Sequence, residues 1–383
     1  MKTIINELTI KNFKSIKEIK LDCKQVNIFI GKPNTGKSNI LEAISLLSGD
    51  MAVKTKFLEG KVYYEKVSDL FNMLDTSRPV SVESNIGDAQ ISFFPNDGLF
   101  GYFADNNGLN HMQNTRSFSS SKEAFKSFID QKSKAEEETN KIYASENALD
   151  YTNSQKVFVH SGSYFSSIIG KDGLVLMVSD SIRSTGIRSY HYKRLTNHGN
   201  TEIGYLLPPY GDNLLEVLQH TPKLQEIIVD FLKPFGFDIV LVFDDPKENK
   251  IKIQKRSGAF HVQLSYSLIA DTFQRMIFHL AAIYSNRDSV ILFEEPEAHT
   301  YAPYQSFLVD EILADEQNQY FITTHSDGIF DSLLREATEK VAVFIVGYDD
   351  SQTKIRPLTD EEVSDYLTGY ASIFQNLDGY SVT

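Results

Sequence analysis

The sequence predicts an α/β fold in which a mixed sheet is flanked by helices and interrupted by a partly helical insertion. Two observations predict it. An apolar strand at Val26–Ile30 is followed at once by a glycine-bounded loop and then by an apolar helix. Toward the C-terminus, fully apolar strands alternate with segments of helical periodicity, which is typical of parallel strands covered by helices.

The remaining elements follow from hydrophobic periodicity and turn residues. A β-branched run at 4–10 predicts the first strand, followed by a polar turn at 11–14. Helical spacing predicts helices at 39–47, 213–220, 224–232 and 271–284. Short apolar or β-branched runs predict strands at 239–243, 251–253, 289–293, 320–323 and 340–346.

This pattern divides the chain into three parts. We predict an N-terminal lobe at 1–93, an insertion at 94–155 and a C-terminal lobe at 156–383. The insertion holds Gly, Asn and Asp clusters, a serine-rich run at 117–121 and a polar stretch at 130–141. It is therefore expected to be partly helical or flexible, and it lacks the sustained apolar heptads of a coiled coil.

Composition excludes several classes of protein. The 38 Lys and Arg residues against 51 Asp and Glu give a net charge of −13, which opposes non-specific binding of nucleic acid by the chain as a whole. The one cysteine, Cys23, has no partner for an intramolecular disulfide. With no signal peptide and no apolar run long enough to cross a bilayer, we expect a cytoplasmic protein without a membrane partner.

The segment after Val26–Ile30 has the pattern G-x-x-x-x-G-K-S, between a strand and a helix. Its residues are Gly31, Lys32, Pro33, Asn34, Thr35, Gly36, Lys37 and Ser38, followed by Asn39 in the helix. Such a loop turns its backbone N–H groups toward phosphates, and the helix adds its positive end. We expect Lys37 to neutralise the β- and γ-phosphates of ATP and Ser38 to bind Mg²⁺.

Polar side chains follow two of the apolar strands. Glu294 and Glu295 end the strand at 289–293, and His325 comes just after the strand at 320–323. Ligands bind at this edge of open α/β sheets. We assign Glu294 to the Mg²⁺ shell, Glu295 to polarising the water that attacks the γ-phosphate, and His325 to contacting that phosphate or water.

Four motifs together resemble the RecF/SMC/OLD group of ABC-type ATPases. They are the N-terminal segment 8–16 (LTIKNFKSI), the phosphate loop or Walker A, the acidic segment 294–299 (EEPEAH) and the segment 323–326 (TTHS). The resemblance covers residues 1–90 and 180–350. It implies an ATPase that dimerises or forms higher oligomers head to tail, with ATP between the phosphate loop of one subunit and the signature helix of the other.

The resemblance also implies roles for individual residues. Asn12, Phe13 and Lys14 would lie near the adenine or ribose, Glu295 would be the catalytic carboxylate and His325 the switch histidine. The signature segment would be 264–275, where Ala270 and Thr272 replace the usual serine and glycine. The contact in trans would then depend on the helix N-terminus, with Asp271 as its cap, and on the Thr272 hydroxyl. The segment at 68–72 lies where the loop that completes the metal shell is expected.

The task of such an ATPase is a separate question. Members of the OLD group carry a nuclease domain, and only 58 residues follow His325 here. We therefore expect an ATPase that senses or regulates in a bacterial anti-phage defence system, together with a separately encoded nuclease or toxin. The alternative is a DNA-binding repair or chromosome-maintenance ATPase, which the basic and aromatic stretch at 183–194 would favour. A transporter subunit is a weaker alternative, because the signature is altered.

Overall fold

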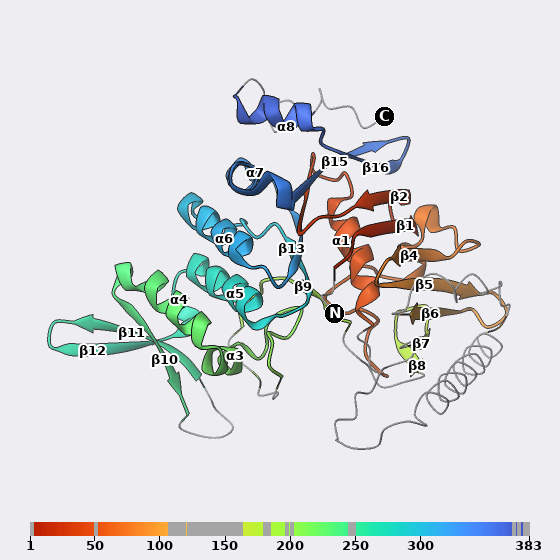
Figure 1. Ribbon diagram of the computed structural model, residues 1–383. Helices are drawn as coiled ribbons and strands as arrows, with labels where there is room; N and C mark the ends of the chain where they lie inside the picture. The colour runs from red at the N-terminus through yellow and green to blue at the C-terminus, as the bar shows by residue number, and fades with distance from the viewer. Residues whose placement is uncertain are drawn as a thin grey trace, which may run out of the picture.

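The computed structural model (Figure 1) describes residues 4–49, 53–105, 120, 164–178, 185–195, 199, 203–243, 250–369, 373 and 377. The strands in these residues form sheets of seven, six and three strands, with helices packed between and beside them. The predicted α/β class is confirmed. Most of the predicted insertion, including the serine-rich run and the polar stretch, lies outside the described residues.

The central sheet is mixed, as predicted, and has the order β16-β15-β3-β14-β13-β9. Five of its strands run parallel and β16 runs antiparallel to β15. The strands are β3 (Val26–Ile30), β9 (Ile187–Tyr190), β13 (Val290–Glu294), β14 (Gln319–Thr323), β15 (Val341–Asp349) and β16 (Gln352–Pro357). The inner strands β3 and β14 are buried along their whole length, which explains why their sequences are mainly apolar.

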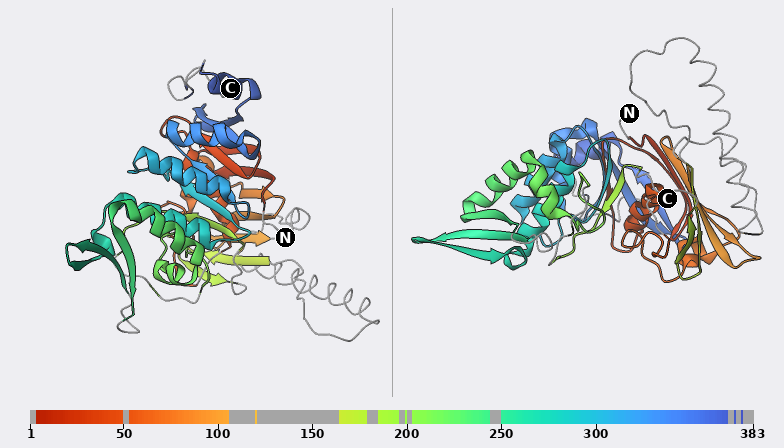
Figure 2. Two further views of the ribbon diagram at one scale, coloured as in Figure 1. Left: turned by 60° about the vertical axis from the view of Figure 1, so that its left-hand side comes forward. Right: turned by 90° about the horizontal axis from the view of Figure 1, so that it is seen from below.

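A second, antiparallel sheet covers one face of the central sheet, with helix α1 (Lys37–Ser45) between the two, as Figure 2 shows from below. Its order is β2-β1-β4-β5-β6-β7-β8. The strands are β1 (Glu7–Phe13), β2 (Ile16–Asp22), β4 (Val80–Ser84), β5 (Gly87–Phe94), β6 (Leu99–Asp105), β7 (Tyr164–Ile169) and β8 (Val175–Val178).

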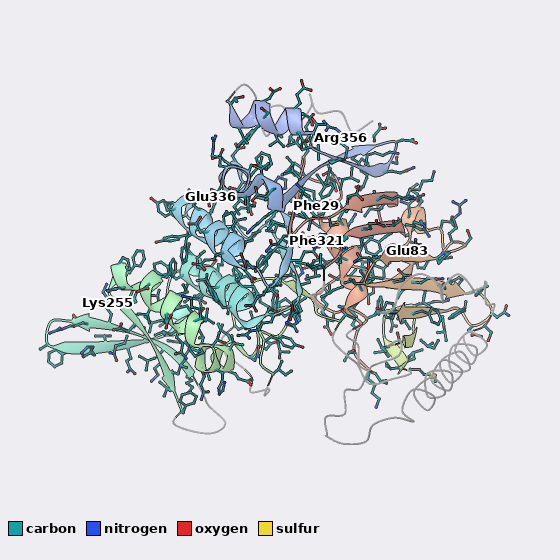
Figure 3. The ribbon with its side chains drawn as sticks, in the orientation of Figure 1. Phe29, Glu83, Lys255, Phe321, Glu336 and Arg356 are labelled. Carbon is teal, nitrogen blue, oxygen red and sulfur yellow. The ribbon has the colours of Figure 1, made fainter. Side chains whose placement is uncertain are left out.

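Helices cover the other face of the central sheet (Figure 1). They are α3 (Leu214–His220), α4 (Pro222–Leu232), α5 (Asp271–Ser285), α6 (Ala302–Ala314) and α7 (Asp327–Ala337), and α8 (Asp360–Leu367) follows β16. Side chains alternate along β3, so Ile28 and Ile30 join this helical core. Phe29 points the opposite way and stacks on Phe321 at 6.3 Å between ring centroids, both labelled in Figure 3. The central sheet therefore has a hydrophobic core on each face.

The third sheet contains β10 (Phe237–Val242), β11 (Lys250–Ser257) and β12 (Phe260–Ser265). Its base packs on the helical core through Ile251 and Ile253, and its outer part projects from the body of the protein (Figure 2). Short 3-10 helices connect other elements: 46–48, 67–70, 72–74, 233–235, 266–268 and 338–340. Among the described residues, no helix has the length and apolar character that a membrane crossing requires.

The structure corrects some predicted boundaries. The polar turn predicted at 11–14 is shorter, because Phe13 is buried and pairs with Ile16, so that β1 continues to Phe13. The strand predicted at 251–253 extends over Lys250–Ser257 and forms a hairpin with β12, which the sequence analysis did not predict. Gly258 allows the tight turn between them with its φ of 61°.

The predicted lobes stay a prediction, but the sheets cross their boundaries. Strand β6 lies inside the predicted insertion, and β7 and β8 lie inside the predicted C-terminal lobe. All three continue the seven-stranded sheet beyond β5, because each pairs antiparallel with the strand before it. The chain returns to the central sheet only at β9.

Candidate nucleotide-binding and hydrolysis site

The phosphate loop joins the carboxyl end of β3 to helix α1, as the sequence predicts. Its two glycines are required by close packing. A Cβ atom added to Gly31 would lie 2.1 Å from the carbonyl oxygen of Val346, and one added to Gly36 would lie 2.0 Å from Oγ1 of Thr353. Gly36 also has a φ of 95° at the N-cap of α1. A larger residue at Gly31 would require movement of the β15 backbone, and one at Gly36 would displace the Thr353 and Ser15 side chains and adopt an unfavourable φ.

Side chains from two other segments hold the loop in place. Thr353 of β16 donates its hydroxyl to the Thr35 carbonyl at 2.9 Å, and its Oγ1 is 2.6 Å from Oγ of Ser15. Asn39 donates its amide to the same Ser15 oxygen at 2.7 Å. The role of Ser15 and Thr353 was not predictable from the sequence, because 338 residues separate them. Asn39, expected to contact nucleotide, uses its side chain for this support.

Lys37 is buried in the loop, with 5% of its surface exposed. Its ammonium donates to the carbonyl oxygens of Gly31 at 3.0 Å and Lys32 at 2.8 Å. Burial lowers the pKa of Lys37 from its ordinary 10.5 to about 8, against the opposing effect of the nearby Glu295 and Glu294 carboxylates. The loop thus holds a largely desolvated cation, and a bound phosphate would stabilise its charged form.

The remaining loop residues differ in their exposure to solvent. Lys32, Pro33 and Asn34 are exposed at its tip, Thr35 is buried and donates to the Lys32 carbonyl at 2.9 Å, and Ser38 is half-buried in the first turn of α1. The tip is therefore open to a ligand, while its base is fixed by hydrogen bonds.

Glu295 and His325, predicted as catalytic residues, lie together. The backbone of Glu295 turns into the left-handed region with a φ of 43°, and its N–H donates to the Thr323 carbonyl at 3.0 Å. Its Oε1 is 3.5 Å from Nε2 of His325. Burial and the charge of Lys37 lower the pKa of His325, and Glu295 opposes them. The carboxylate is about half exposed, so water reaches it.

Glu294 lies on the other side of the same turn. One oxygen of its half-buried carboxylate is 3.6 Å from Nδ1 of His191, whose Nε2 is 2.9 Å from Oγ of Ser189. Burial lowers the pKa of His191, and Glu294 opposes this. His191 belongs to the 183–194 stretch that we considered for DNA contacts, and its place beside Glu294 depends on the pairing of β9 with β13.

The residues present fit Mg²⁺. Ser38 and Glu294 offer a hydroxyl and a carboxylate oxygen, and Mg²⁺ is usually bound by one or two such protein groups together with substrate phosphates. The charge of Glu294 reaches Lys37, which places this carboxylate near the phosphate loop. Within the described part of the chain, no group of three or more His, Cys, Asp or Glu side chains could hold a metal ion.

Glu297 is a positioning residue that the sequence analysis missed, although it lies in the quoted acidic motif. Its Oε1 accepts hydrogen bonds from the His325 backbone N–H at 2.7 Å and from the Thr324 hydroxyl at 2.8 Å. Its Oε2 is buried and has no partner. Burial raises the pKa of Glu297, and these hydrogen bonds oppose the rise. The carboxyl group connects the turn after β13 to the turn after β14.

The three N-terminal residues expected near the adenine or ribose all use their side chains within the protein. Phe13 is fully buried in the core between the sheets, so only its backbone can reach a ligand. Asn12 donates to the Arg78 carbonyl at 2.7 Å, and Lys14 forms an ion pair with the buried Glu42. The expected contacts of these residues with ATP remain predictions.

The segment at 68–72, whose role the sequence left open, lies against the turn between β1 and β2. Asn72 donates its side-chain amide to the Lys14 carbonyl at 2.7 Å, and the Lys14 N–H donates to the Leu70 carbonyl at 2.9 Å. This segment therefore fixes the position of the turn that also carries Ser15.

The N-terminus of α5 differs from the prediction. Ala270 holds the cap position, and Asp271 is the first helical residue and caps nothing. Its carboxylate instead accepts from Arg275 at 2.7 Å and Arg194 at 3.1 Å, because two cations lie beside it. Thr272 donates its hydroxyl to the His299 carbonyl at 3.0 Å. A contact of either residue with ATP remains a prediction.

Of the stretch at 183–194, the structure describes 185–194, and within it Lys193 and Arg194 are exposed while Arg188 is not. Arg183 lies outside the described residues. Arg188 and Tyr190 are buried in β9, and Arg194 pairs with Asp271. Arg188 is therefore excluded as a surface contact for nucleic-acid phosphates.

A glycine loop on a helix N-terminus, with a buried lysine and an adjacent acidic strand end, defines the class of P-loop nucleoside-triphosphate hydrolases. Comparison with protein families is more specific. The family model "AAA ATPase domain" matches residues 1–170, and "AAA domain, putative AbiEii toxin, Type IV TA system" matches residues 209–331. The first match includes the phosphate loop, and the second includes Glu294, Glu295 and His325. The chain is an ATPase with AAA-type ATP-binding domains, which confirms the resemblance at this level.

Solved structures with a similar arrangement include three heads of SMC proteins. One is the SmcHead bound to the C-winged helix domain of ScpA, with a TM-score of 0.49 and 13% identity over 94% of this chain and 99% of that one. A second is the Smc head domain with an extended coiled coil, bound to the C-terminal domain of ScpA derived from Pyrococcus furiosus. Its TM-score is 0.44 and its identity 12%, over 96% of this chain and 99% of that one. The third is the SMC head domain from Thermotoga maritima, with a TM-score of 0.39 and 10% identity over 93% of this chain and 99% of that one. No curated protein matches this chain.

ATP binding is expected to weaken as pH rises through about 8. The pKa of Lys37 is lowered to about 8 in the nucleotide-free protein, and phosphates favour its protonated form. Affinity is therefore fully present below pH 8 and falls by up to about tenfold per pH unit above it. Calorimetry at pH 7 and 9 in buffers of different ionisation enthalpy measures this together with the proton uptake. Equal affinities and no proton uptake would contradict the lysine's assignment.

Proposed function

We propose that this ATPase binds ATP with Mg²⁺ and closes into a head-to-tail dimer, in which the α5 N-terminus of one subunit meets the phosphate loop of the other. The observation that carries the proposal is the convergence of Lys37, Glu295 and His325 at one edge of the central sheet. Among the described residues, the hydrogen bonds of Asp271 and Thr272 go to α5, to 192–194 and to His299, and none goes to the phosphate loop. A second subunit would bring the two together.

In this mechanism Glu295 accepts a proton from the attacking water as the water adds to the γ-phosphorus and the bond to ADP breaks. His325 donates or accepts a hydrogen bond at the same water or at the γ-phosphate, and in the nucleotide-free protein burial and the charge of Lys37 lower its pKa. Lys37 holds the phosphate oxygens. Bound Mg²⁺ would neutralise charge on the β- and γ-phosphates, held by Ser38 and Glu294.

We further propose that the dimer senses or regulates in a bacterial anti-phage defence system with a separately encoded nuclease or toxin. The second matching family, whose description includes a putative AbiEii toxin of a Type IV TA system, supports this role. The net charge of −13 also favours a protein partner over bare DNA. Cells that express the gene with its neighbours should resist phage, and Lys37→Ala should abolish resistance. Equal plaque numbers with and without the intact genes, over a phage panel, would refute the role.

One surface favours the alternative of a DNA-binding ATPase. The projecting sheet carries Lys252, Lys255 and Arg256 on β11, and Lys255 and Arg256 are exposed. Lys255 is labelled in Figure 3. If this sheet contacts DNA, affinity should fall steeply with salt, and Lys252→Glu with Arg256→Glu should weaken binding at low salt. Lys17→Glu with Lys20→Glu on the exposed face of β2 is the matched control. Absence of binding at low salt would exclude this alternative.

A further inference from the structure

A second cavity lies away from the nucleotide site, at the end of the central sheet where β13 begins. Its volume is about 820 Å³, which is within the range of small-molecule sites. Its walls come from the start of α4, the ends of α5 and α6, residues 204–205 and Arg188 of β9. Figure 1 labels these elements. The ATP site lies at the other end, after Glu294, so the two sites share the sheet but no residue.

Arg188 is the unusual group in this wall. Only 9% of its surface is exposed, and among the described residues no carboxylate oxygen lies within 4 Å of its nitrogen atoms. Its Nη1 donates to the side-chain oxygens of Asn286 and of Ser289, the latter at 3.1 Å. Its guanidinium carbon is 3.4 Å from the centre of the Tyr205 ring, and its Nε is buried without a partner. A buried cation with neutral neighbours and an unused donor lacks its counter-charge.

Helix α4 presents its N-terminus to the same cavity. Thr221 is the N-cap, Pro222 begins the helix, and Lys223 follows in the first turn, and all three line the cavity. The Thr221 side chain caps no backbone N–H group, so the positive end of an eleven-residue helix is uncapped there. Lys223 adds a second cation, 3.7 Å from Glu226 and 63% exposed, and Arg287 also lines the cavity as a third.

Three acidic residues line the cavity, Glu311, Asp315 and the exposed Glu316, and the first two accept hydrogen bonds from neighbouring residues. Glu311 of α6 accepts from the Tyr284 hydroxyl. Asp315 accepts from the hydroxyl of Tyr320, from the amide of Asn318 at 2.7 Å and from the Gln317 N–H at 2.8 Å. Arg188 and the start of α4 bring positive charge and helix N-terminal N–H groups to the cavity wall, which favours a ligand with acceptor oxygens.

We propose that this cavity binds a small molecule through an oxyanion group, a carboxylate or a phosphate, held by Arg188 with Lys223 and the N-terminus of α4. The acidic residues on the α6 side limit the total negative charge of the ligand and favour one that also carries an ammonium or hydroxyl group. This inference is independent of the proposed function, because no residue of the cavity takes part in ATP binding.

Inorganic phosphate and glycine are suitable probes, one for each kind of oxyanion. The Lys37→Ala protein should be used, since its phosphate loop no longer competes for phosphate. At constant ionic strength, one of the two probes is expected to bind saturably in calorimetry and to raise the melting temperature. Arg188→Gln should weaken binding at least about tenfold, the loss of one charge-assisted hydrogen bond. Binding of phosphate alone identifies a phosphorylated ligand, and binding of glycine alone identifies a carboxylate.

Lys223→Gln provides a second test, because this exposed side chain does not support the fold. It should weaken binding of the same probe several-fold, while Lys255→Gln, on the distant β11, should leave it unchanged. If neither phosphate nor glycine binds saturably, or if Arg188→Gln and Lys223→Gln bind the probe as tightly as their parent, the proposal is wrong.

Discussion

Glu295→Gln is expected to lower the rate of ATP hydrolysis by about 10²- to 10⁴-fold, the range for loss of a general base. Glutamine keeps the size of the side chain and its hydrogen-bonding reach to His325, whose Nε2 is 3.5 Å from the carboxylate, but it cannot accept the proton. ATP binding should persist because Lys37 and the loop are unchanged. The variant should then accumulate as an ATP-bound dimer, measured by phosphate release and by light scattering after gel filtration.

Glu316→Gln is the matched control, because it makes the same chemical change on an exposed residue in the wall of the second cavity. It should hydrolyse ATP at the rate of the unmodified protein. If Glu295→Gln keeps that rate, the carboxylate is not the base. If Glu295→Gln binds ATP but stays monomeric in ATP and Mg²⁺, the head-to-tail dimer is excluded. The assignment of the hydrolysis site is not affected by that result.

Lys37→Ala is expected to reduce ATP affinity by at least about 100-fold, which corresponds to loss of one or two hydrogen bonds to a charged group. The melting temperature should not fall, because the substitution removes a cation whose burial lowers its pKa to about 8. Fluorescent-nucleotide titration and thermal denaturation measure the two effects. Lys17→Ala, on the exposed face of β2, should change neither. Unchanged ATP affinity in Lys37→Ala would refute the phosphate-loop assignment.

The fold was predictable where a local pattern carries the information. The strands at 26–30, 290–293 and 319–323 are buried along their length, so their sequences are mainly apolar, with Asn27, Gln319 and Thr323 as buried polar exceptions. Strands β6 to β8 were not assigned: β6 pairs with the neighbouring β5, but β7 pairs with β6 across a long insertion, and β8 follows β7. Pairing of that kind leaves no local signature in either strand.

The candidate site shows the same division. The motif residues Lys37, Glu295 and His325 were identified because phosphate binding and hydrolysis require particular chemical groups at the ends of particular strands. Ser15, Thr353 and His191 were missed, because their roles come from the residues they meet: Ser15 and Thr353 support the loop, and His191 lies beside Glu294. Asp271 was misassigned as a cap, since its sequence position does not reveal Arg194 beside it.

By itself, the sequence determined that this chain is an α/β protein with a phosphate loop and an acidic strand end, because glycine, lysine and glutamate in that order have few other physical uses. The tertiary structure alone decided which side chains support the loop, and that Arg188 of β9 is buried at the wall of a cavity instead of being displayed at the surface. Burial and partnership are properties of three-dimensional neighbours, and a buried arginine has the same letter in the sequence as an exposed one.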